Sequence, residues 1–146
     1  MPSLCDVNVL LALCHASHIH HASALNWLNT ITADSQVAIC RMSQLGLLRL
    51  LNNPSIMLGE PLDAGAAWHV YDRMMSDERF IFCAEPHTLE DNLRRMIPRR
   101  LASPRLWQDT YLAAFAVSAG YSYVSFDRGF RQFKELELLL LGDAGD

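Results

Sequence analysis

The sequence predicts one α/β domain in which helices cover both faces of a mainly parallel sheet of four or five strands. Short apolar segments that fit buried strands alternate with amphipathic segments of helical spacing, which is the pattern of strand-crossover-strand units. The length of 146 residues suits a single core. Hydrophobic residues make up 51% and charged residues 19%, which argues against a disordered or coiled-coil chain. We therefore expect residues 1–146 to form one domain.

The expected strands are short apolar runs, each followed by a polar or helix-breaking residue. They lie at residues 3–6, 36–39, 80–83, 121–126 and, as a final addition, 136–141. The first strand is expected to convert into a helix near Asp6, and Asp127-Arg128-Gly129 ends the fourth.

The expected helices follow apolar residues that recur every three or four positions. They lie at residues 7–13, 22–31, 45–51, 61–75, 89–97, 106–119 and, as a short one, 129–133. Three residues set their ends. Pro61 is expected at a helix start, Thr88 with Asp91 resembles a capping pattern, and Gly120 is expected as a C-terminal cap.

Several classes of protein are excluded by composition. The longest apolar stretches, 9–14 and 138–141, are far shorter than the roughly 20 residues that cross a bilayer, so no membrane span is expected. No positive region precedes the first apolar run, which favours the cytoplasm over secretion. The four cysteines match neither a C-x-x-C metal pair nor a disulfide framework and are expected as reduced, buried thiols. A net charge of −4 means that any nucleic-acid role needs a local basic patch.

Three acidic residues are candidates for chemistry. Asp6 and Asp127 follow the first and fourth expected strands, and ligands of open α/β sheets bind at that edge. Asp109 stands in the first turn of a mostly apolar helix, where an acid needs compensation. Each has a simpler explanation, as a helix cap or as a favourable charge at a helix N-terminus. If the three carboxylates converge, their repulsion calls for a cation, most simply Mg²⁺ or Mn²⁺, which would suit phosphodiester hydrolysis.

A basic segment leads into Asp109. Five of the twelve basic residues fall within residues 94–105, namely Arg94, Arg95, Arg99, Arg100 and Arg105. Guanidinium groups match phosphate oxygens, so Arg99, Arg100 and Arg105 are candidate contacts to a nucleic-acid backbone. The alternative is that this segment is only a solvated face.

Five short blocks, in this order, resemble the PIN-domain ribonucleases of the VapC toxin type. They are Leu-Cys-Asp-Val-Asn-Val-Leu-Leu-Ala-Leu from Leu4, His20-His21-Ala22 followed by Trp27-Leu28, Cys-Arg-Met-Ser-Gln-Leu-Gly-Leu-Leu-Arg-Leu-Leu from Cys40, Asp-Thr-Tyr-Leu-Ala from Asp109 and Val-Ser-Phe-Asp-Arg-Gly-Phe from Val124. The resemblance covers nearly the whole chain. It implies a Rossmann-like PIN fold, Mg²⁺-dependent endoribonuclease activity on RNA and inhibition by a VapB-like antitoxin.

The resemblance also assigns roles by position. Asp6, Asp109 and Asp127 align with acidic metal-site residues, and Asn8 and Ser125 with polar residues that support them. One position departs from the pattern, because Gln44 stands where many members carry Glu. An amide oxygen accepts a bond but supplies neither negative charge nor a proton acceptor.

Three explanations of Gln44 remain open: an active subgroup of the family, an engineered inactivating change, or a natural pseudo-enzyme. We favour the first, because three carboxylates remain. On this view, changing Gln44 to Glu should tighten Mg²⁺ binding by adding a negative charge.

Other functions compete with the ribonuclease. The main alternative is a catalytically impaired PIN-fold module that binds RNA or an antitoxin. A phosphoaspartate receiver or haloacid-dehalogenase-like phosphatase fits poorly, because Asp6-Val7-Asn8 and the single Lys134 match neither pattern. The histidines at positions 15, 18, 20 and 21 show no metal-ligand spacing. The apolar surplus around Trp68 and Tyr71 and in residues 45–51 suggests a homodimer.

Overall fold

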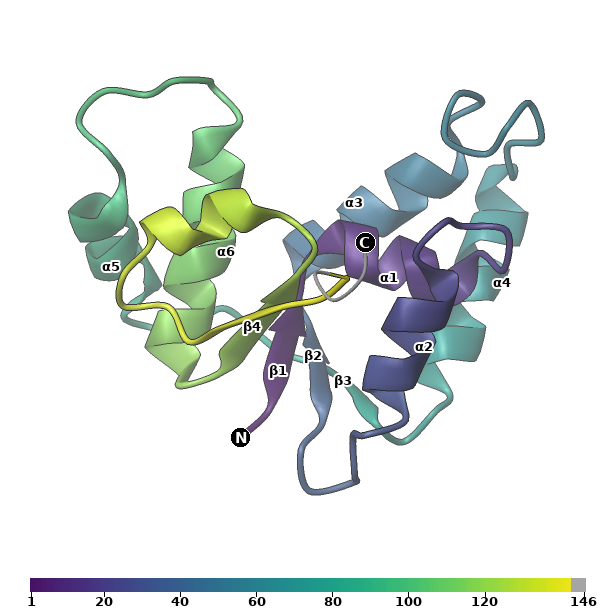
Figure 1. Ribbon diagram of the computed structural model, residues 1–146, viewed down its shortest axis with the longest axis horizontal. Coiled ribbons are helices and arrows are strands. Elements are labelled where there is room, and N and C mark those ends of the chain that lie inside the picture. The colour runs from purple at the N-terminus through teal and green to yellow at the C-terminus, as the bar shows by residue number, and fades with distance from the viewer. Residues whose placement is uncertain (143–146) are drawn as a thin grey trace.

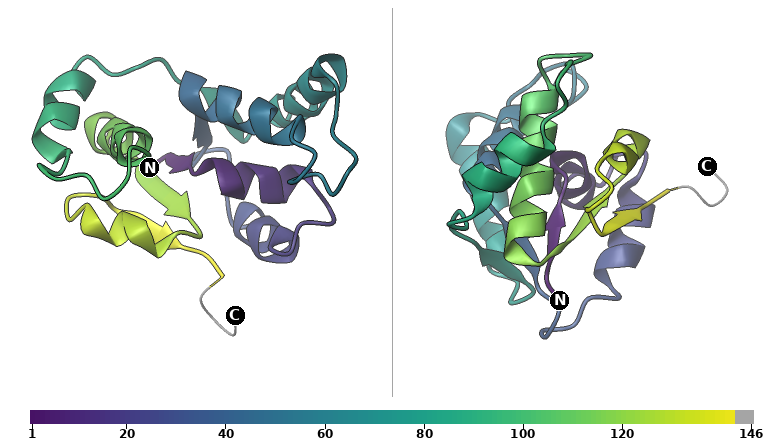
Figure 2. Two further views of the ribbon diagram at one scale, coloured as in Figure 1. Left: turned by 90° about the horizontal axis from the view of Figure 1, so that it is seen from above. Right: turned by 90° about the vertical axis from the view of Figure 1, so that its left-hand side faces the viewer.

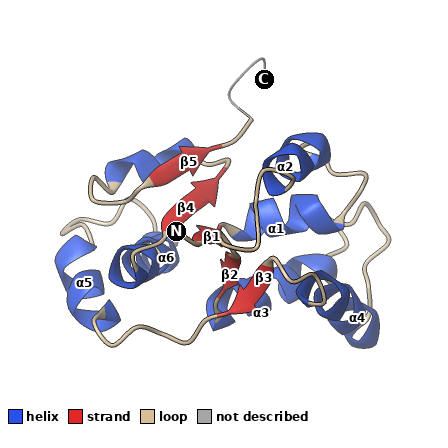
Figure 3. Ribbon diagram, turned by 90° about the horizontal axis from the view of Figure 1, so that it is seen from below, coloured by secondary structure: helices blue, strands red, loops and turns tan. Residues whose placement is uncertain are grey.

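The computed structural model describes residues 1–142, so residues 143–146 of the expected domain lie outside the described part. All strands pair in parallel in one five-stranded sheet with the order β3-β2-β1-β4-β5, which Figure 3 shows from β3 at the bottom of the view to β5 at the top. The strands are β1 (Ser3–Cys5), β2 (Val37–Ile39), β3 (Phe80–Phe82), β4 (Ser122–Ser125) and β5 (Leu138–Leu140). The predicted α/β class with a parallel sheet is confirmed.

Helices cover both faces of this sheet, as Figures 1 and 2 show. On one side lie α1 (Val7–Cys14), α2 (His21–Leu28), α3 (Arg41–Leu51) and α4 (Ala64–Met75). On the other lie α5 (Leu89–Met96), α6 (Leu106–Ala119) and the short 3-10 helix η1 (Arg128–Gln132). This three-layer arrangement leaves no strand face without a helical cover near the sheet centre.

Alternating side chains of the strands supply two separate cores. Cys5 of β1 and Val124 of β4 point into the core beneath α1 to α4. Leu4 and Tyr123, one residue earlier on the same strands, point into the core beneath α5 and α6. These residues have no measurable exposure, so both faces of the central strands are buried.

The central strands bring their carboxyl ends together. Neighbouring strands β1 and β4 are paired from Ser3 opposite Ser122 to Cys5 opposite Val124, and the Asp6 amide donates to the Val124 carbonyl at 2.8 Å. The strand order reverses at β1 and β4, which is the position where open α/β sheets hold ligands. The residues that follow β1 and β4 are therefore placed at this point by the topology.

Most element boundaries were predicted within a few residues, and α6 with its Gly120 cap was predicted in full. Two expected start signals differ from the structure in part. Pro61 precedes α4, which begins after Asp63, and the Asp63 carboxylate accepts the Ala66 amide at 2.8 Å. Thr88 stands at the N-cap of α5, but its side chain makes no capping bond. The sequence pattern therefore located both helices, but Asp63 caps α4 in place of the expected start at Pro61, and the expected capping bond of Thr88 is not formed.

The four cysteines form no disulfide, as expected from their spacing. All four cysteines are free, with Cys5 and Cys40 buried and Cys14 and Cys83 half-buried. Burial raises the pKa of the Cys14 thiol to about 11, so it stays protonated at neutral pH.

Within residues 1–142, no helix is both long and apolar enough to span a bilayer.

Candidate active site

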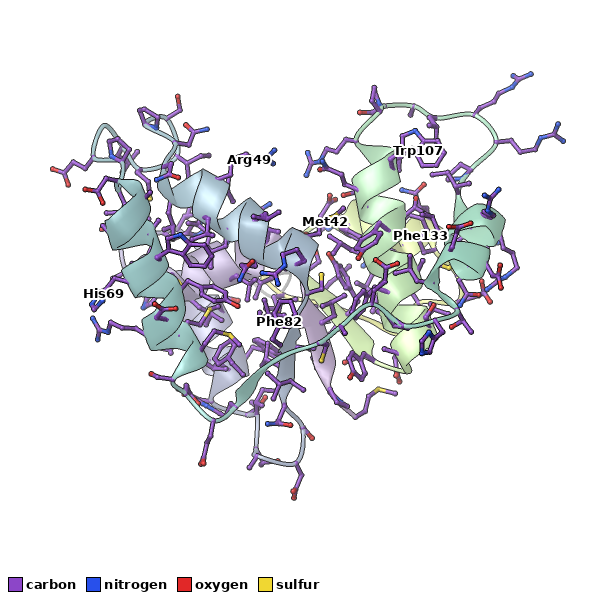
Figure 4. The ribbon with its side chains drawn as sticks, turned by 180° about the vertical axis from the view of Figure 1, so that it is seen from behind. Met42, Arg49, His69, Phe82, Trp107 and Phe133 are labelled. Atoms are coloured by element: carbon purple, nitrogen blue, oxygen red, sulfur yellow. The ribbon has the colours of Figure 1, made fainter. Side chains whose placement is uncertain are left out.

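A groove lies between α3 and α6 above the carboxyl end of the sheet. Its volume is about 920 Å³, and both wall helices contribute polar and apolar side chains. The charged residues that line it are Asp6, Arg41, Arg49, Glu85, Arg105 and Asp109. Figure 4 shows Met42 and Arg49 on the α3 wall, with Trp107 near the start of α6 on the other side.

Asp6 follows β1 directly and occupies the N-cap position of α1 without making a side-chain capping bond. Its Oδ2 atom instead accepts a hydrogen bond of 2.7 Å from the Ser125 hydroxyl at the end of β4. Burial raises the pKa of this carboxyl above its ordinary value, the Ser125 bond opposes that shift, and the nearby Asp127 charge adds to it. The capping explanation for Asp6 is therefore wrong, because its side chain is committed to β4.

Asp109 lies in the first turn of α6 and is half-buried. Burial raises its pKa, the Arg105 guanidinium lowers it, and the charges of Asp6 and Asp127 raise it further. Asp109 thus does not stand alone in solvent. The chain brings it into the electrostatic field of the other two acids from more than 100 positions away from Asp6.

Asp127 follows β4 and combines two roles that the sequence presented as alternatives. Its Oδ1 atom accepts the Gly129 amide at 2.8 Å, which caps η1. Its own amide donates to the Ser125 hydroxyl oxygen at 2.9 Å, and its charge acts on both Asp6 and Asp109. Ser125 therefore connects Asp6 and Asp127 directly.

The donor chemistry of this site fits a hard divalent cation. Mg²⁺ prefers carboxylate oxygens, and the raised pKa values of Asp6 and Asp109 show that a compensating positive charge would be favourable there. Among residues 1–142, however, no three acidic, histidine or cysteine side chains are grouped as a complete metal site. The charges of the three carboxylates act on one another, but an ion would have to draw the carboxylates closer together.

Gln44 lies on the first turns of α3, and only 5% of it is exposed. Its Oε1 atom accepts a hydrogen bond of 2.6 Å from Nη1 of Arg41. The guanidinium carbon of Arg41 also lies 4.8 Å from the centre of the Phe82 ring. The amide oxygen that the sequence offered as a metal contact is therefore engaged with a cation of the chain itself.

Residues 3–136 match the family model described as "PIN domain". The chain is 39% identical over 142 residues to "Ribonuclease VapC41" of Mycobacterium tuberculosis (strain CDC 1551 / Oshkosh), covering 94% of this chain and 97% of the relative. The chain belongs to the PIN-domain family. The resemblance to VapC-type proteins noted in the sequence is confirmed.

Solved PIN-domain structures share this fold at low sequence identity. The VapBC2 complex of Rickettsia felis, bound to a DNA fragment from its promoter, aligns with a TM-score of 0.74 at 13% identity, covering 97% of this chain and all of the other. VapC20 of Mycobacterium tuberculosis, described as a sarcin-ricin loop cleaving toxin, aligns with a TM-score of 0.65 at 18% identity, covering 92% and 97%. At such identities the likeness shows the fold alone.

The PIN domain places the predicted arginines in different surroundings. Arg105 lines the groove, whereas Arg99 and Arg100 are exposed in the α5–α6 loop and do not. Arg94 pairs with Glu90 at 3.0 Å, and Arg95 pairs with Glu135. For those two residues the solvated-face explanation is the better one. Asn8, the expected supporting residue on α1, is exposed and lines the groove near Asp6.

Sequence reasoning missed three groove residues of this PIN domain. Arg41 and Arg49 come from α3, which the sequence presented as an apolar helix. Glu85 follows β3, and its Oε2 atom accepts a hydrogen bond of 3.1 Å from the Tyr111 hydroxyl. The rule that singled out Asp6 and Asp127, a polar residue just after a strand, would also have found Glu85.

Proposed function

We propose that this PIN domain is an endoribonuclease that requires Mg²⁺ or Mn²⁺ and acts as the toxin of a toxin–antitoxin pair. The observation that carries the proposal is the groove that Asp6 and Asp109 line together with three arginines, while Asp127 is close enough for its charge to act on both acids. Neighbouring carboxylates can hold a hard cation such as Mg²⁺, and arginines beside them can bind phosphate. An RNA backbone satisfies both requirements at once.

The residues of the chain divide the work of phosphodiester hydrolysis. Asp6 and Asp109 line the groove and would hold the ion, and the charge of Asp127 would add to theirs. Ser125 fixes the orientation of the Asp6 carboxylate and keeps more of it ionised. A Mg²⁺ ion held by these carboxylates would supply an activated water and positive charge for the phosphate.

The groove also provides positive charge for the substrate. Arg41, Arg49 and Arg105 line it and form no ion pair within residues 1–142. Arg105 comes just before α6 and lowers the pKa of Asp109, so its guanidinium lies near the acidic site. A phosphate next to the scissile bond would bind to these arginines. Arg99 and Arg100 would contact RNA only outside the groove.

Two partners are proposed for this chain, an antitoxin and a second copy of the chain itself. VapBC2 is a complex, and a VapB-like antitoxin is proposed as the partner of this chain. A homodimer is proposed because Trp68 on α4, outside the groove, is 44% exposed, which leaves apolar helix surface uncovered. We also propose a cytoplasmic location, where RNA is available and the four free thiols stay reduced.

RNA cleavage with and without metal tests the proposed activity. Purified protein should cleave single-stranded or structured RNA with Mg²⁺ present and stop when EDTA is added. Asp6→Asn should abolish cleavage, whereas Asp72→Asn, on the exposed face of α4, should leave it unchanged. RNA binding without Mg²⁺-dependent cleavage would instead favour the impaired binding module, with Gln44 as the reason.

A further inference from the structure

Arg41 stands where local helix chemistry disfavours it. It is the first residue of α3, where the partial positive charge of the helix opposes a cation, and the first turn of α3 contains no acid. A carboxylate at position 44 would both suit this helix end and pair with Arg41, but the chain has the neutral Gln44 there. Departures from local preference of this kind are expected at functional positions.

Two contacts nevertheless hold the Arg41 guanidinium in one place. Gln44, itself buried, accepts from Nη1 at 2.6 Å, and the Phe82 ring lies 4.8 Å from Cζ. A guanidinium has five N–H donors, and among the described residues only this one bond to Arg41 is formed. Arg41 is exposed and lines the groove together with Asp6 and Asp109. Its remaining donors are available to a ligand in the groove.

The neutrality of Gln44 is what keeps this cation effective. An ion pair would cancel the charge of Arg41, whereas a carbonyl oxygen orients the guanidinium and leaves its charge intact. We infer that Arg41 binds a phosphate of the RNA strand in the groove, and that Gln44 is a positioning residue that holds Arg41 for this contact. The inference rests on the proposed ribonuclease function and assigns to Gln44 a role that needs no metal contact.

RNA binding without metal separates this role from catalysis. The probe is a fluorescein-labelled single-stranded RNA, and its affinity is measured by anisotropy in EDTA over a range of salt concentrations. Arg41→Met keeps a side chain that packs on Phe82 and removes the charge. It should weaken binding by about ten-fold. The slope of log affinity against log salt concentration should become shallower by about 0.7, which is the contribution of one phosphate contact to a single strand. Arg73→Gln on α4, outside the groove, is the matched control and should change neither value.

A double-mutant cycle tests the positioning role of Gln44. Gln44→Met removes the acceptor without adding charge, so it should weaken RNA binding in the wild-type background and have little further effect when combined with Arg41→Met. Gln44→Glu should weaken RNA binding by pairing with Arg41, and thermal unfolding of each variant checks that the fold persists. An independent, additive effect of Gln44→Met would overturn the positioning role.

The inference and the proposed function fail in different ways. If Arg41→Met binds RNA with wild-type affinity and salt dependence, the inference is wrong, even if the protein cleaves RNA and Asp6→Asn does not. If Arg41→Met weakens binding but wild-type protein cleaves no RNA with Mg²⁺, the phosphate contact stands and the nuclease proposal does not.

Discussion

The hydroxyl of Ser125 donates a hydrogen bond of 2.7 Å to the Asp6 carboxylate across 119 positions of sequence. The same hydroxyl oxygen accepts the amide of Asp127 at 2.9 Å. One buried serine thus joins the ends of the two central strands and the two acids that follow them. This small group connects the sheet topology to the chemistry of the groove.

Replacing Ser125 by alanine should weaken metal binding more than it weakens the fold. The hydroxyl lowers the pKa of Asp6, so its loss leaves that carboxyl more often protonated and less well oriented. Loss of a group that orients a metal ligand typically costs 10- to 100-fold in affinity, and we expect about ten-fold, measured by calorimetric Mg²⁺ titration. Ser122→Ala is the matched control, because the hydroxyl of Ser122, on the same strand, is hydrogen-bonded to Ser3 at 2.9 Å and not to Asp6 or Asp127. Equal losses in both variants would assign Ser125 a purely structural role.

Asp109→Asn should make the metal-free protein more stable while removing its response to Mg²⁺. Burial and the charges of Asp6 and Asp127 disfavour ionised Asp109, and an amide relieves both effects. For a domain of this size, each kcal/mol gained raises Tm by roughly 2–4 °C, which calorimetry in EDTA would detect. Wild-type Tm should rise on adding Mg²⁺, and the variant should gain much less. A variant less stable than wild type in EDTA contradicts the assignment of an electrostatically costly carboxylate.

The site should also govern how metal-free stability changes with pH. Asp6 and Asp109 have raised pKa values in the folded protein, so their contribution to stability is complete below the unfolded carboxyl pKa of about 4 and is lost as pH rises through the folded values. Mg²⁺ affinity should rise over the same window, because protons and metal compete for the same oxygens. Denaturant unfolding and Mg²⁺ titrations across pH measure both trends. Metal affinity that stays flat from pH 4 to 7 would rule out these carboxylates as the ligands.

Much of this architecture could be predicted because it rests on local patterns. Strand and helix periods set the α/β class, and polar residues after β1 and β4 indicated Asp6 and Asp127. The pairing of Arg41 with Gln44 and Phe82 could not be predicted, because Phe82 comes from a strand about 40 positions away. Counting arginines overvalued residues 94–105, since sequence does not show that Arg94 and Arg95 are paired with acids. Local rules thus located the acids, while the positive side of the groove depended on tertiary contacts.

Gln44→Glu should bind Mg²⁺ more tightly than wild type, as the charge argument from sequence predicts, while it binds RNA less well. The new carboxylate would pair with Arg41 at the position of the 2.6 Å bond, so the pair changes from a net cation to neutral. A less positive wall favours Mg²⁺ and disfavours phosphate. Mg²⁺ titration and KM measurements in one buffer should therefore move in opposite directions. A change in kcat alone, with Mg²⁺ affinity and KM unaltered, would mean that position 44 acts on the chemical step instead.

Gly46→Ala should destabilise the fold and disturb the site, although alanine favours helix. A Cβ atom at position 46 of α3 would lie 2.9 Å from a methyl carbon of Val7, the first residue of α1. Val7 is β-branched and has little rotamer freedom in a helix, so α3 must move away from α1. Overpacking costs about 1–3 kcal/mol against roughly 1 kcal/mol of gained helix propensity.

The clash between α3 and Val7 should also disturb Asp6, because Val7 follows it directly. We therefore expect Gly46→Ala to lower both Mg²⁺ affinity and the rate of RNA cleavage. Gly65→Ala is the control, since its Cβ would meet only the Asp63 carboxylate at 3.6 Å, an ordinary contact at the start of α4. It should stabilise the protein by about 0.5–1 kcal/mol in urea unfolding and leave the groove unchanged. If both alanine variants are equally stabilised, the close packing of α3 on α1 does not constrain Asp6.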